Sequence, residues 1–260
     1  MKSQKFATCG HYAEDAKDCV AIHVCDGRVD ARKARWGKGT DMLLSRSAVQ
    51  DFYTKNLDRY GSFIAAFQSP KATRALLRSS HLLRAGLRVL DAGCGFGMVT
   101  FALLQALEEK NLDYEAVDAF DLTPAMLARF HSELESRGVS RVQIRQADVL
   151  ALEALPPSWA NYELIISASM LEYLPKRDFP RALAGLRSRL APDGHILVVI
   201  TRKTPETKVL IERWWHAERY TKNELLCAFD EAGFRAPVFR RFLWRYFWLN
   251  RANYVIEAAA

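Results

Sequence analysis

Residues 89–98 read VLDAGCGFGM, an apolar run that ends in an aspartate and is followed by three glycines at alternate positions. A glycine has no Cβ, so it allows a sharp turn and lets a bound molecule approach the backbone closely, at an entropic cost. In open parallel sheets, ligands bind beyond the carboxyl ends of the strands. The stretch therefore predicts a ligand site at residues 93–97, directly after a buried strand.

From about residue 86 onward, short apolar runs alternate with amphipathic ones, which indicates βα units and a mainly parallel sheet. Parallel strands are predicted at LRVLDA (87–92), YEAVDAFD (114–121), VQIRQAD (142–148), YELIISAS (162–169) and HILVVITR (195–202). Helices are predicted at MVTFALLQALEEK (98–110), TPAMLARFHSELESRG (123–138), FPRALAGLRSRLAPDG (179–194, closed by a proline–glycine turn) and TKNELLCAFDEAGF (221–234). The late stretches APVFRRF (236–242) and ANYVIEA (252–258) suit a final hairpin at the sheet edge.

The first 85 residues have a different character and are interpreted as a helical cap. Residues 47–67 and 70–86 have the pattern of helices, and nothing before them repeats the βα rhythm. We therefore expect an N-terminal cap or substrate lid at 1–85 and the ligand-binding domain at 86–260.

Composition is that of an ordinary globular protein, half apolar and about a quarter charged. The net charge of +7 suits an anionic substrate, a nucleic acid or an acidic membrane surface, and does not choose among them. No apolar run reaches the ~20 residues of a membrane-spanning helix, and the N-terminus lacks the apolar core of a secretory signal. Scattered cysteines predict reduced thiols and a cytoplasmic protein. The oligomeric state stays open.

A metal site is not expected. The N-terminal cysteines and histidines match no standard zinc-ligand spacing; they are Cys9, His11, Cys19, His23 and Cys25.

The glycines do not fit a pyrophosphate-binding loop, but aspartates follow the next two strands. Met98 stands where a dinucleotide fingerprint needs its third glycine, and no lysine followed by serine or threonine is present. Asp121 ends the second predicted strand beside the loop, where a carboxylate can accept hydrogen bonds from both hydroxyls of a ribose. Asp148 ends the third and is placed to hold the exocyclic amine of an adenine.

Taken in order, VLDAGCGFG, DLTPAML, QADV, YELIISASMLEYL and LRSRLAPDGHILVVITR resemble the class I S-adenosylmethionine-dependent methyltransferases over roughly residues 85–258. The resemblance implies an α/β, Rossmann-like, doubly wound seven-stranded sheet, mainly parallel, with an N-terminal helical cap. It implies S-adenosyl-L-methionine (SAM) as cofactor and S-adenosyl-L-homocysteine (SAH) as product. The implied cofactor contacts are Asp91, Gly93, Cys94 and Gly95 at the methionine part, Asp121 and Leu122 at the ribose and adenine, Asp148 and Val149 at the adenine amine, and Ser169 on the reaction side.

Asp118 is a rival for the ribose role. It lies three residues before Asp121, so strand alternation points it to the opposite face of the sheet. The match of DLTPAML to the family pattern favours Asp121.

Residues that act on the methyl acceptor are harder to choose. The candidates for catalysis are Tyr60, on the predicted helix 47–67, and His216, in RWWHAERY (213–220). The alternative for Tyr60 is core packing, and the alternative for His216 is packing or exposure to solvent. Tyr60 stands seven residues after Tyr53, which is also the spacing of a core-facing helix stripe. The remaining candidates are Tyr53, Glu172 and Tyr173 as bases or substrate contacts, and Trp214 and Trp215 as a wall of the acceptor pocket. The aromatic stretch FLWRYFWLNR (242–251) is interpreted as an edge strand.

The function predicted from these patterns is O-, N-, S- or C-methylation of a small-molecule acceptor of aromatic or anionic character, by direct in-line transfer. An RNA or protein methyltransferase is the alternative, suggested by the positive charge and RVDARKAR (28–35). The segment after the fourth strand carries neither an Asn/Asp-Pro-Pro-aromatic nor a Pro-Cys motif, so a nucleic-acid partner is not expected. From other classes, a nicotinamide (NAD-type) oxidoreductase or a non-catalytic cofactor-binding protein stays open.

Overall fold

Seven strands form one sheet in the order β3-β2-β1-β4-β5-β7-β6. A computed structural model describes residues 45–66, 69–210 and 217–260 of the chain. Strands β1 to β5 run parallel, and β7 lies antiparallel between β5 and β6. The strands are β1 (Leu87–Ala92), β2 (Tyr114–Asp121), β3 (Val142–Gln146), β4 (Tyr162–Ala168), β5 (Leu190–Thr201), β6 (Arg235–Arg240) and β7 (Asn253–Ala259). This confirms the predicted fold, with the nearly all-apolar β4 at the centre.

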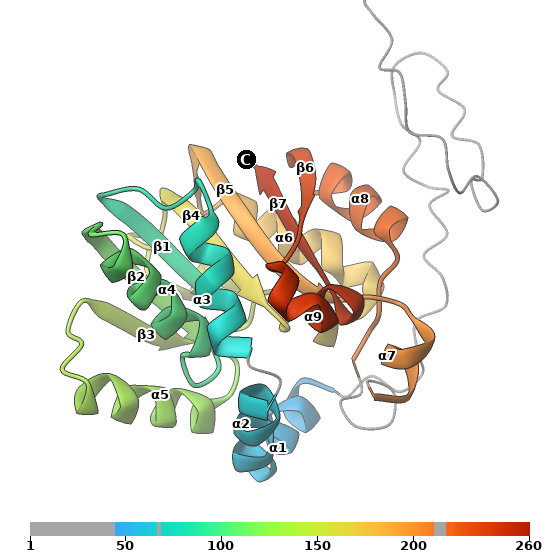
Figure 1. Cartoon of the computed structure of the whole chain (residues 1–260), viewed down its shortest axis with the longest axis horizontal. Coiled ribbons are helices and arrows are strands. Elements are labelled where there is room, and N and C mark those ends of the chain that lie inside the picture. Colours follow the sequence, from blue (N-terminus) through green and yellow to red (C-terminus); the bar gives the residue numbers. More distant parts are fainter. Residues whose placement is uncertain (1–44, 67–68, 211–216) are drawn as a thin grey trace, which may run out of the picture. The chain divides into compact units, whose positions relative to one another are not determined.

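Helices cover both faces of the sheet (Figure 1). One face packs against α3 (Ser69–Ser79), α4 (Met98–Glu109), α5 (Pro124–Ser136) and α9 (Phe247–Ala252). The other packs against α6 (Phe179–Arg187) and α8 (Lys222–Glu231). The remaining elements are α1 (Arg46–Lys55), α2 (Leu57–Ala66), α7 (Pro205–Leu210) and the short 3₁₀ turns η2 (Leu152–Ala154), η3 (Leu171–Tyr173), η4 (Lys176–Asp178) and η6 (Trp244–Tyr246).

The lead-in segment forms two helices rather than the one predicted. Asn56 separates α1 from α2, and its side-chain amide donates to the carbonyl of Phe52 at 2.8 Å. That bond satisfies a carbonyl at the end of α1 and ends the helix there. The next helix, α3, is also shorter than the predicted 70–86 and ends at Ser79.

Two predictions about the C-terminal half are wrong in detail. Helix α6 ends at Arg187, and Pro192 to Gly194 belong to a bulge at the start of β5, where the register passes from Tyr162 opposite Leu190 to Leu164 opposite His195. A Cβ on Gly194 would lie 2.6 Å from the carbonyl oxygen of Tyr162, so the bulge needs glycine there. The stretch 242–251 is not an edge strand; it forms η6 and α9.

The glycine loop (residues 93–97) connects β1 to α4, and each of its three glycines has a left-handed backbone conformation. Gly97, with φ of 90°, precedes the first residue of α4. A Cβ there would lie 2.2 Å from the ring of Phe130 on α5. The loop is therefore held against α5 as well as against the sheet.

We predict that Gly97→Ala lowers the free energy of unfolding by about 2–4 kcal/mol, from left-handed strain and from overpacking against Phe130. Gly138→Ala is the matched control, because Gly138 also has a positive φ (63°) but nothing lies within 4 Å of its added Cβ. We expect the control to lose only about 1 kcal/mol. Urea denaturation measures both, and equal losses would contradict the packing argument.

Candidate functional site

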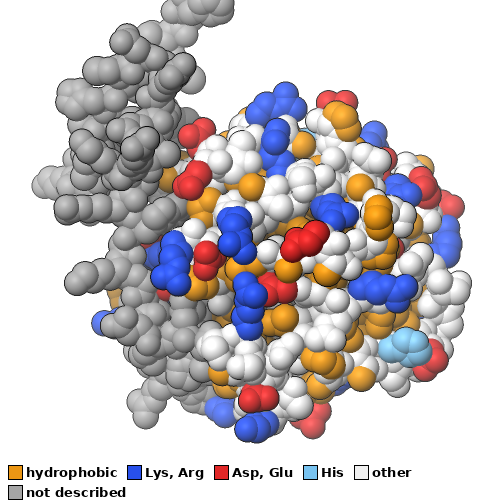
Figure 2. Space-filling view, turned by 180° about the vertical axis from the view of Figure 1, so that it is seen from behind, with side chains coloured by type: hydrophobic (Ala, Val, Ile, Leu, Met, Phe, Trp, Pro, Cys, Tyr) orange, Lys and Arg blue, Asp and Glu red, His pale blue; other side chains and the backbone are white. Residues whose placement is uncertain are grey.

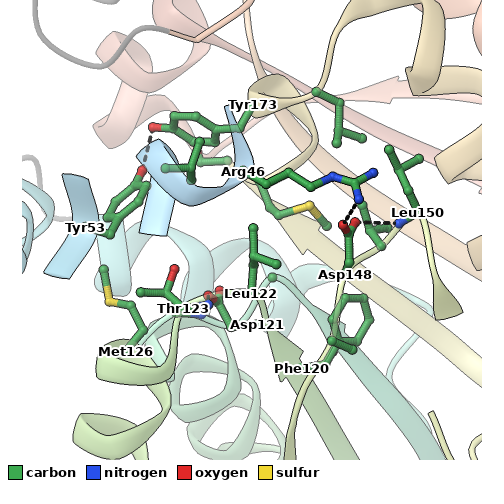
Figure 3. Close-up of a pocket in the computed structure, with 18 of the residues that line it drawn as sticks. Arg46, Tyr53, Phe120, Asp121, Leu122, Thr123, Met126, Asp148, Leu150 and Tyr173 are labelled. Atoms are coloured by element: carbon green, nitrogen blue, oxygen red, sulfur yellow. Dashed lines mark hydrogen bonds and ion pairs between the residues drawn. The ribbon is translucent and has the colours of Figure 1, made fainter. Parts of the chain in front are cut away.

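A cavity of about 260 Å³, the strand-end pocket, lies at the carboxyl ends of β1 to β4. The residues that follow these strands line it, and residues of α1 close it from the other side (Figure 3). Its walls are largely apolar, with Phe120, Leu122, Met126, Val149 and Leu174 among them. A concave, apolar site with a few convergent polar groups is typical of small-molecule and cofactor binding.

The glycines of the loop serve different purposes at this pocket. A Cβ on Gly93 would lie 2.3 Å from Met170, so packing requires a glycine there. Gly95 lines the pocket and nothing lies within 4 Å of its missing Cβ, so its face is open to a ligand. The side chain of Cys94, in contrast, packs beside Ala119 in the core under α5 and does not line the pocket.

Asp121 joins the glycine loop to the end of β2. Its Oδ2 accepts a hydrogen bond from the Gly95 amide at 2.9 Å, and its Oδ1 accepts one from the Thr123 amide at 2.8 Å. Burial raises the pKa of Asp121, and these backbone donors oppose the rise. Each carboxylate oxygen keeps a further lone pair, so the group can still accept from a ligand in the pocket.

Asp118 points to the opposite face of the sheet, as strand alternation predicts. It is 2% exposed, and the hydroxyl of Tyr162 donates to its Oδ2 at 2.7 Å. It does not line the strand-end pocket. Its partner is therefore a core tyrosine, whereas Asp121 lines the strand-end pocket.

Asp91, at the end of β1, is a buried carboxylate that is only half satisfied. Thr100 donates to its Oδ2 at 2.6 Å, while its Oδ1 has no hydrogen-bond partner among the described residues. Burial raises the pKa of Asp91 to about 7, and the negative charge of Asp121 adds to the rise. An unpaired buried oxygen of this kind suits a cationic or N–H-bearing group. Asp91 itself is 1% exposed and does not line the strand-end pocket, although its neighbours Gly93 and Gly95 do.

Helix α1 makes three polar contacts with the loops that border the pocket. Arg46 pairs with Asp148 at 2.8 Å, Gln50 donates to the carbonyl of Leu122 at 2.7 Å, and Tyr53 donates to the hydroxyl of Tyr173 at 2.5 Å (Figure 3). Their spacing of four and three residues places all three on one face of the helix. Sequence reasoning missed Arg46 and Gln50, whose spacing also fits an ordinary amphipathic helix.

Asp148 is therefore already engaged on both oxygens, because the Leu150 amide donates to its Oδ1 at 2.8 Å. Ser169 lines the pocket with a positive φ of 54°, and its amide donates to the carbonyl of Val199. The predicted contacts Leu122 and Val149 line the pocket as well.

Glu172 makes structural contacts and does not line the strand-end pocket. It is 3% exposed, and its two oxygens accept from the backbone amide and the hydroxyl of Thr201, each at 2.9 Å. Burial raises the pKa of Glu172 to about 7. The side chain thus ties η3 to the end of β5 and holds its neighbour Tyr173 at the pocket wall.

Several predicted residues lie outside the part of the chain that the structure describes. These are His216, Trp214, Trp215, the side chain of Tyr60, and the N-terminal set of Cys9, His11, Cys19, His23 and Cys25. Within residues 45–66, 69–210 and 217–260, no group of three metal-ligating side chains comes together. In the same ranges, every helix is too short or too polar to cross a bilayer.

Residues 89–194 match the model of a family described as a methyltransferase domain. The chain is 30% identical to a malonyl-[acyl-carrier protein] O-methyltransferase of Halorhodospira halophila, over 77% of this chain and 65% of that protein. It is 27% identical to a carboxy-S-adenosyl-L-methionine synthase of Chromohalobacter salexigens, over 74% of this chain and 76% of that one. The chain thus spans just under two thirds of the first of these relatives.

The fold is also that of magnesium protoporphyrin IX methyltransferase from Synechocystis, solved with bound SAH. The two chains superpose with a TM-score of 0.62 at 18% identity, over 83% of this chain and 99% of that one. At this identity the likeness concerns the fold alone.

We predict that the half-satisfied Asp91 makes stability fall as pH rises. Its folded pKa of about 7 lies above the ordinary aspartate value of 3.8, so the native state binds the proton more tightly than the unfolded state does. The contribution of this proton to the free energy of unfolding is fully present below pH ~4. It is lost as the pH rises to about 7, and it changes little above that pH. Asp91→Asn should flatten this slope and raise the free energy of unfolding at pH 8 by about 1–3 kcal/mol.

Chemical denaturation between pH 5 and 8, within the window set by that pKa, measures this slope. Glu172→Gln is the comparison. The pKa of Glu172 is also raised to about 7, so this substitution should flatten the slope as well. Both oxygens of Glu172 have partners, so it should not raise the free energy of unfolding at pH 8. An Asp91→Asn variant that is less stable than the parent at pH 8 would contradict the assignment of an unpaired charge.

Proposed function

The chain belongs to the class I S-adenosylmethionine-dependent methyltransferases, and on this premise we propose that it transfers the methyl group of SAM to a small-molecule acceptor. The observation that carries the proposal is the open face of Gly95, held by Asp121 at the mouth of an apolar cavity. When bound, SAM supplies a methyl group on a positively charged sulfur, which needs little more than an aligned nucleophile shielded from water.

The residues present fit this cofactor. The unpaired Oδ1 of Asp91 suits the ammonium group of its methionine part. Asp121 would accept from the ribose hydroxyls, because its two backbone bonds leave lone pairs free. The apolar side chains Leu122 and Val149 would flank the adenine. The open face of Gly95 would let the backbone approach the methionine part closely.

Asp148 can accept a hydrogen bond from the adenine amine only if its carboxylate binds the amine in addition to its present partners. Arg46 and the Leu150 amide each occupy one oxygen, but a carboxylate offers about four acceptor positions. We infer that Arg46 stays in place and that Asp148 holds the amine and the guanidinium together. The closed position of α1 would then be part of the cofactor site.

We propose that Tyr53 and Tyr173 orient the acceptor. Both line the pocket, their hydroxyls are hydrogen-bonded, and their rings meet edge to face with centroids 5.6 Å apart. They come from the cap helix and from the segment after β4, on the side of the pocket away from Asp148 (Figure 3). The aromatic rings, with Met126 and Met170, favour a flat or apolar acceptor. Tyr60 and His216 stay predictions.

The first test is cofactor binding. We expect the purified chain to bind SAM or SAH with a dissociation constant on the order of micromolar, and Asp121→Asn to weaken this binding roughly 10–100-fold through loss of charge-assisted bonds. Asp118→Asn is the matched control and should stay within about twofold, because that residue faces the core. Titration calorimetry measures both dissociation constants. A binding heat with NAD, and none with SAM or SAH, would overturn the proposal.

The second test is transfer. We expect labelled methyl groups to move from SAM to a member of a pool of phenols, amines, thiols or lipids. With the acceptor so found, Tyr53→Phe should lower kcat/KM for that acceptor about 10–100-fold, since one oriented polar group contributes a few kcal/mol. The dissociation constant of SAH should change little.

Tyr114→Phe is the control for the second test, because Tyr114 lies at the start of β2 and does not line the pocket. Transfer confined to RNA or protein substrates would contradict the small-molecule proposal. A Tyr53→Phe variant with unchanged kcat/KM would remove the tyrosine pair from the acceptor site.

A further inference from the structure

The segment from β6 to β7 exposes aromatic side chains on a strongly basic background. Residues 232–256 contain five arginines and no aspartate or glutamate. Two of the five pair with acids outside this range, Arg240 with Glu257 and Arg251 with Glu206. Trp244 is 86% exposed and Phe247 is 59% exposed, although large apolar side chains are usually covered. Neither is needed to hold the segment in place, because Phe242, Tyr246 and Leu249 anchor it in the core.

Further cations lie beside this segment on α3. Lys71, Arg74 and Arg78 of α3 and Arg245 of η6 line one hollow, together with a single acid, Glu109. Glu109 pairs with Arg74 at 3.4 Å and with Arg78 at 3.5 Å, so it neutralises only part of the charge. We call the side chains of Lys71, Arg74, Arg78, Arg241, Trp244, Arg245 and Phe247 the α3–α9 patch.

The α9 end of the patch lies near the edge of the sheet that holds the strand-end pocket, while Arg78 pairs with Glu109 at the far end of α4. The last residue of α9, Ala252, accepts a hydrogen bond from the amide of Arg202, directly after the carboxyl end of β5. Figure 1 shows α3 and α9 next to each other on the near face, with α1 and α2 below them. A surface that binds the patch would therefore reach, at its α9 end, the edge of the sheet where the pocket lies.

The face on the far side of the sheet differs. Figure 2 shows it with lysine and arginine side chains interspersed with acidic ones and with apolar side chains scattered between them. The concentration of positive charge around exposed aromatic rings is thus a property of the α3–α9 patch and not of every face.

We propose that the α3–α9 patch binds the surface of a membrane that contains anionic lipids. Lysine and arginine side chains near such a surface are attracted to its charge, and tryptophan and phenylalanine insert at the level of the headgroups. A fluid interface accepts protruding rings without a matching shape. A protein partner would have to offer a fitted pocket to each ring, and a single-stranded nucleic acid is bound along a groove, whereas Trp244 projects from a helical turn.

Co-sedimentation of the full chain with vesicles tests this proposal. We expect binding to vesicles of phosphatidylcholine mixed with phosphatidylglycerol, weak binding to phosphatidylcholine alone, and loss of binding at high salt. Arg241→Glu with Arg245→Glu should weaken partitioning at least 25-fold, from about 5-fold for each positive charge removed. Trp244→Ser with Phe247→Ser should weaken it roughly tenfold or more through lost apolar burial.

The matched control is Arg145→Glu with Arg187→Glu, which makes the same change of charge at exposed positions on β3 and α6. It should retain most of the binding. All variants should keep the parent's thermal unfolding midpoint and affinity for SAH within error, since none of these side chains lines the strand-end pocket.

Equal weakening by the control and the patch variants would overturn the proposal, because it would reduce the effect to net charge. Failure to sediment with anionic vesicles would overturn it too. If the chain instead bound poly-L-glutamate or a single-stranded oligonucleotide through the patch, the surface would belong to an acidic protein or a nucleic acid.

Discussion

The hydrogen bond between the Gly95 amide and the carboxylate of Asp121 is the contact on which the site depends. It is 2.9 Å long and joins the glycine loop after β1 to the end of β2. Without this bond, the open face of Gly95 and the free lone pairs of Asp121 would not be held in fixed positions relative to each other. The same carboxylate repels Asp91 across the loop and helps to raise the pKa of that residue. Asp121 thus holds the glycine loop in place, and its charge makes a positively charged partner for Asp91 more favourable.

The closing of the pocket rests on α1, which touches a different loop with each of three side chains. Arg46, Gln50 and Tyr53 reach the segments after β3, β2 and β4, respectively. Because Arg46 is 59% exposed, its pair with Asp148 contributes little free energy by itself. A lid held by modest contacts can open for exchange of small molecules, whereas the sheet beneath it is held by a continuous apolar core.

The sequence predicted best where local pattern and burial agree. The bounds of β1 and β2 match the predicted runs. An apolar run flanked by polar turn residues indicates where a strand begins and ends. The bulge in β5 was missed because Ala191 to Gly194 look like a helix end, and only the close passage by Tyr162 explains them. The aromatic stretch 242–251 has the alternating pattern of a strand. In the structure, however, Phe242, Tyr246 and Leu249 pack as one face of a helical turn. Among the predicted site residues, Asp121 could be chosen by alternation, whereas Arg46 and Gln50 gain meaning only from the loops they meet.

The most direct measurement of the central claim is a crystal structure of the chain with SAH bound. The account predicts density in the strand-end pocket, with the ribose hydroxyls on Asp121, the ammonium group on the now-paired Oδ1 of Asp91, and the Gly95–Asp121 bond intact. Density elsewhere, or a pocket that binds SAH with Asp91 and Asp121 both turned away from it, would contradict the account.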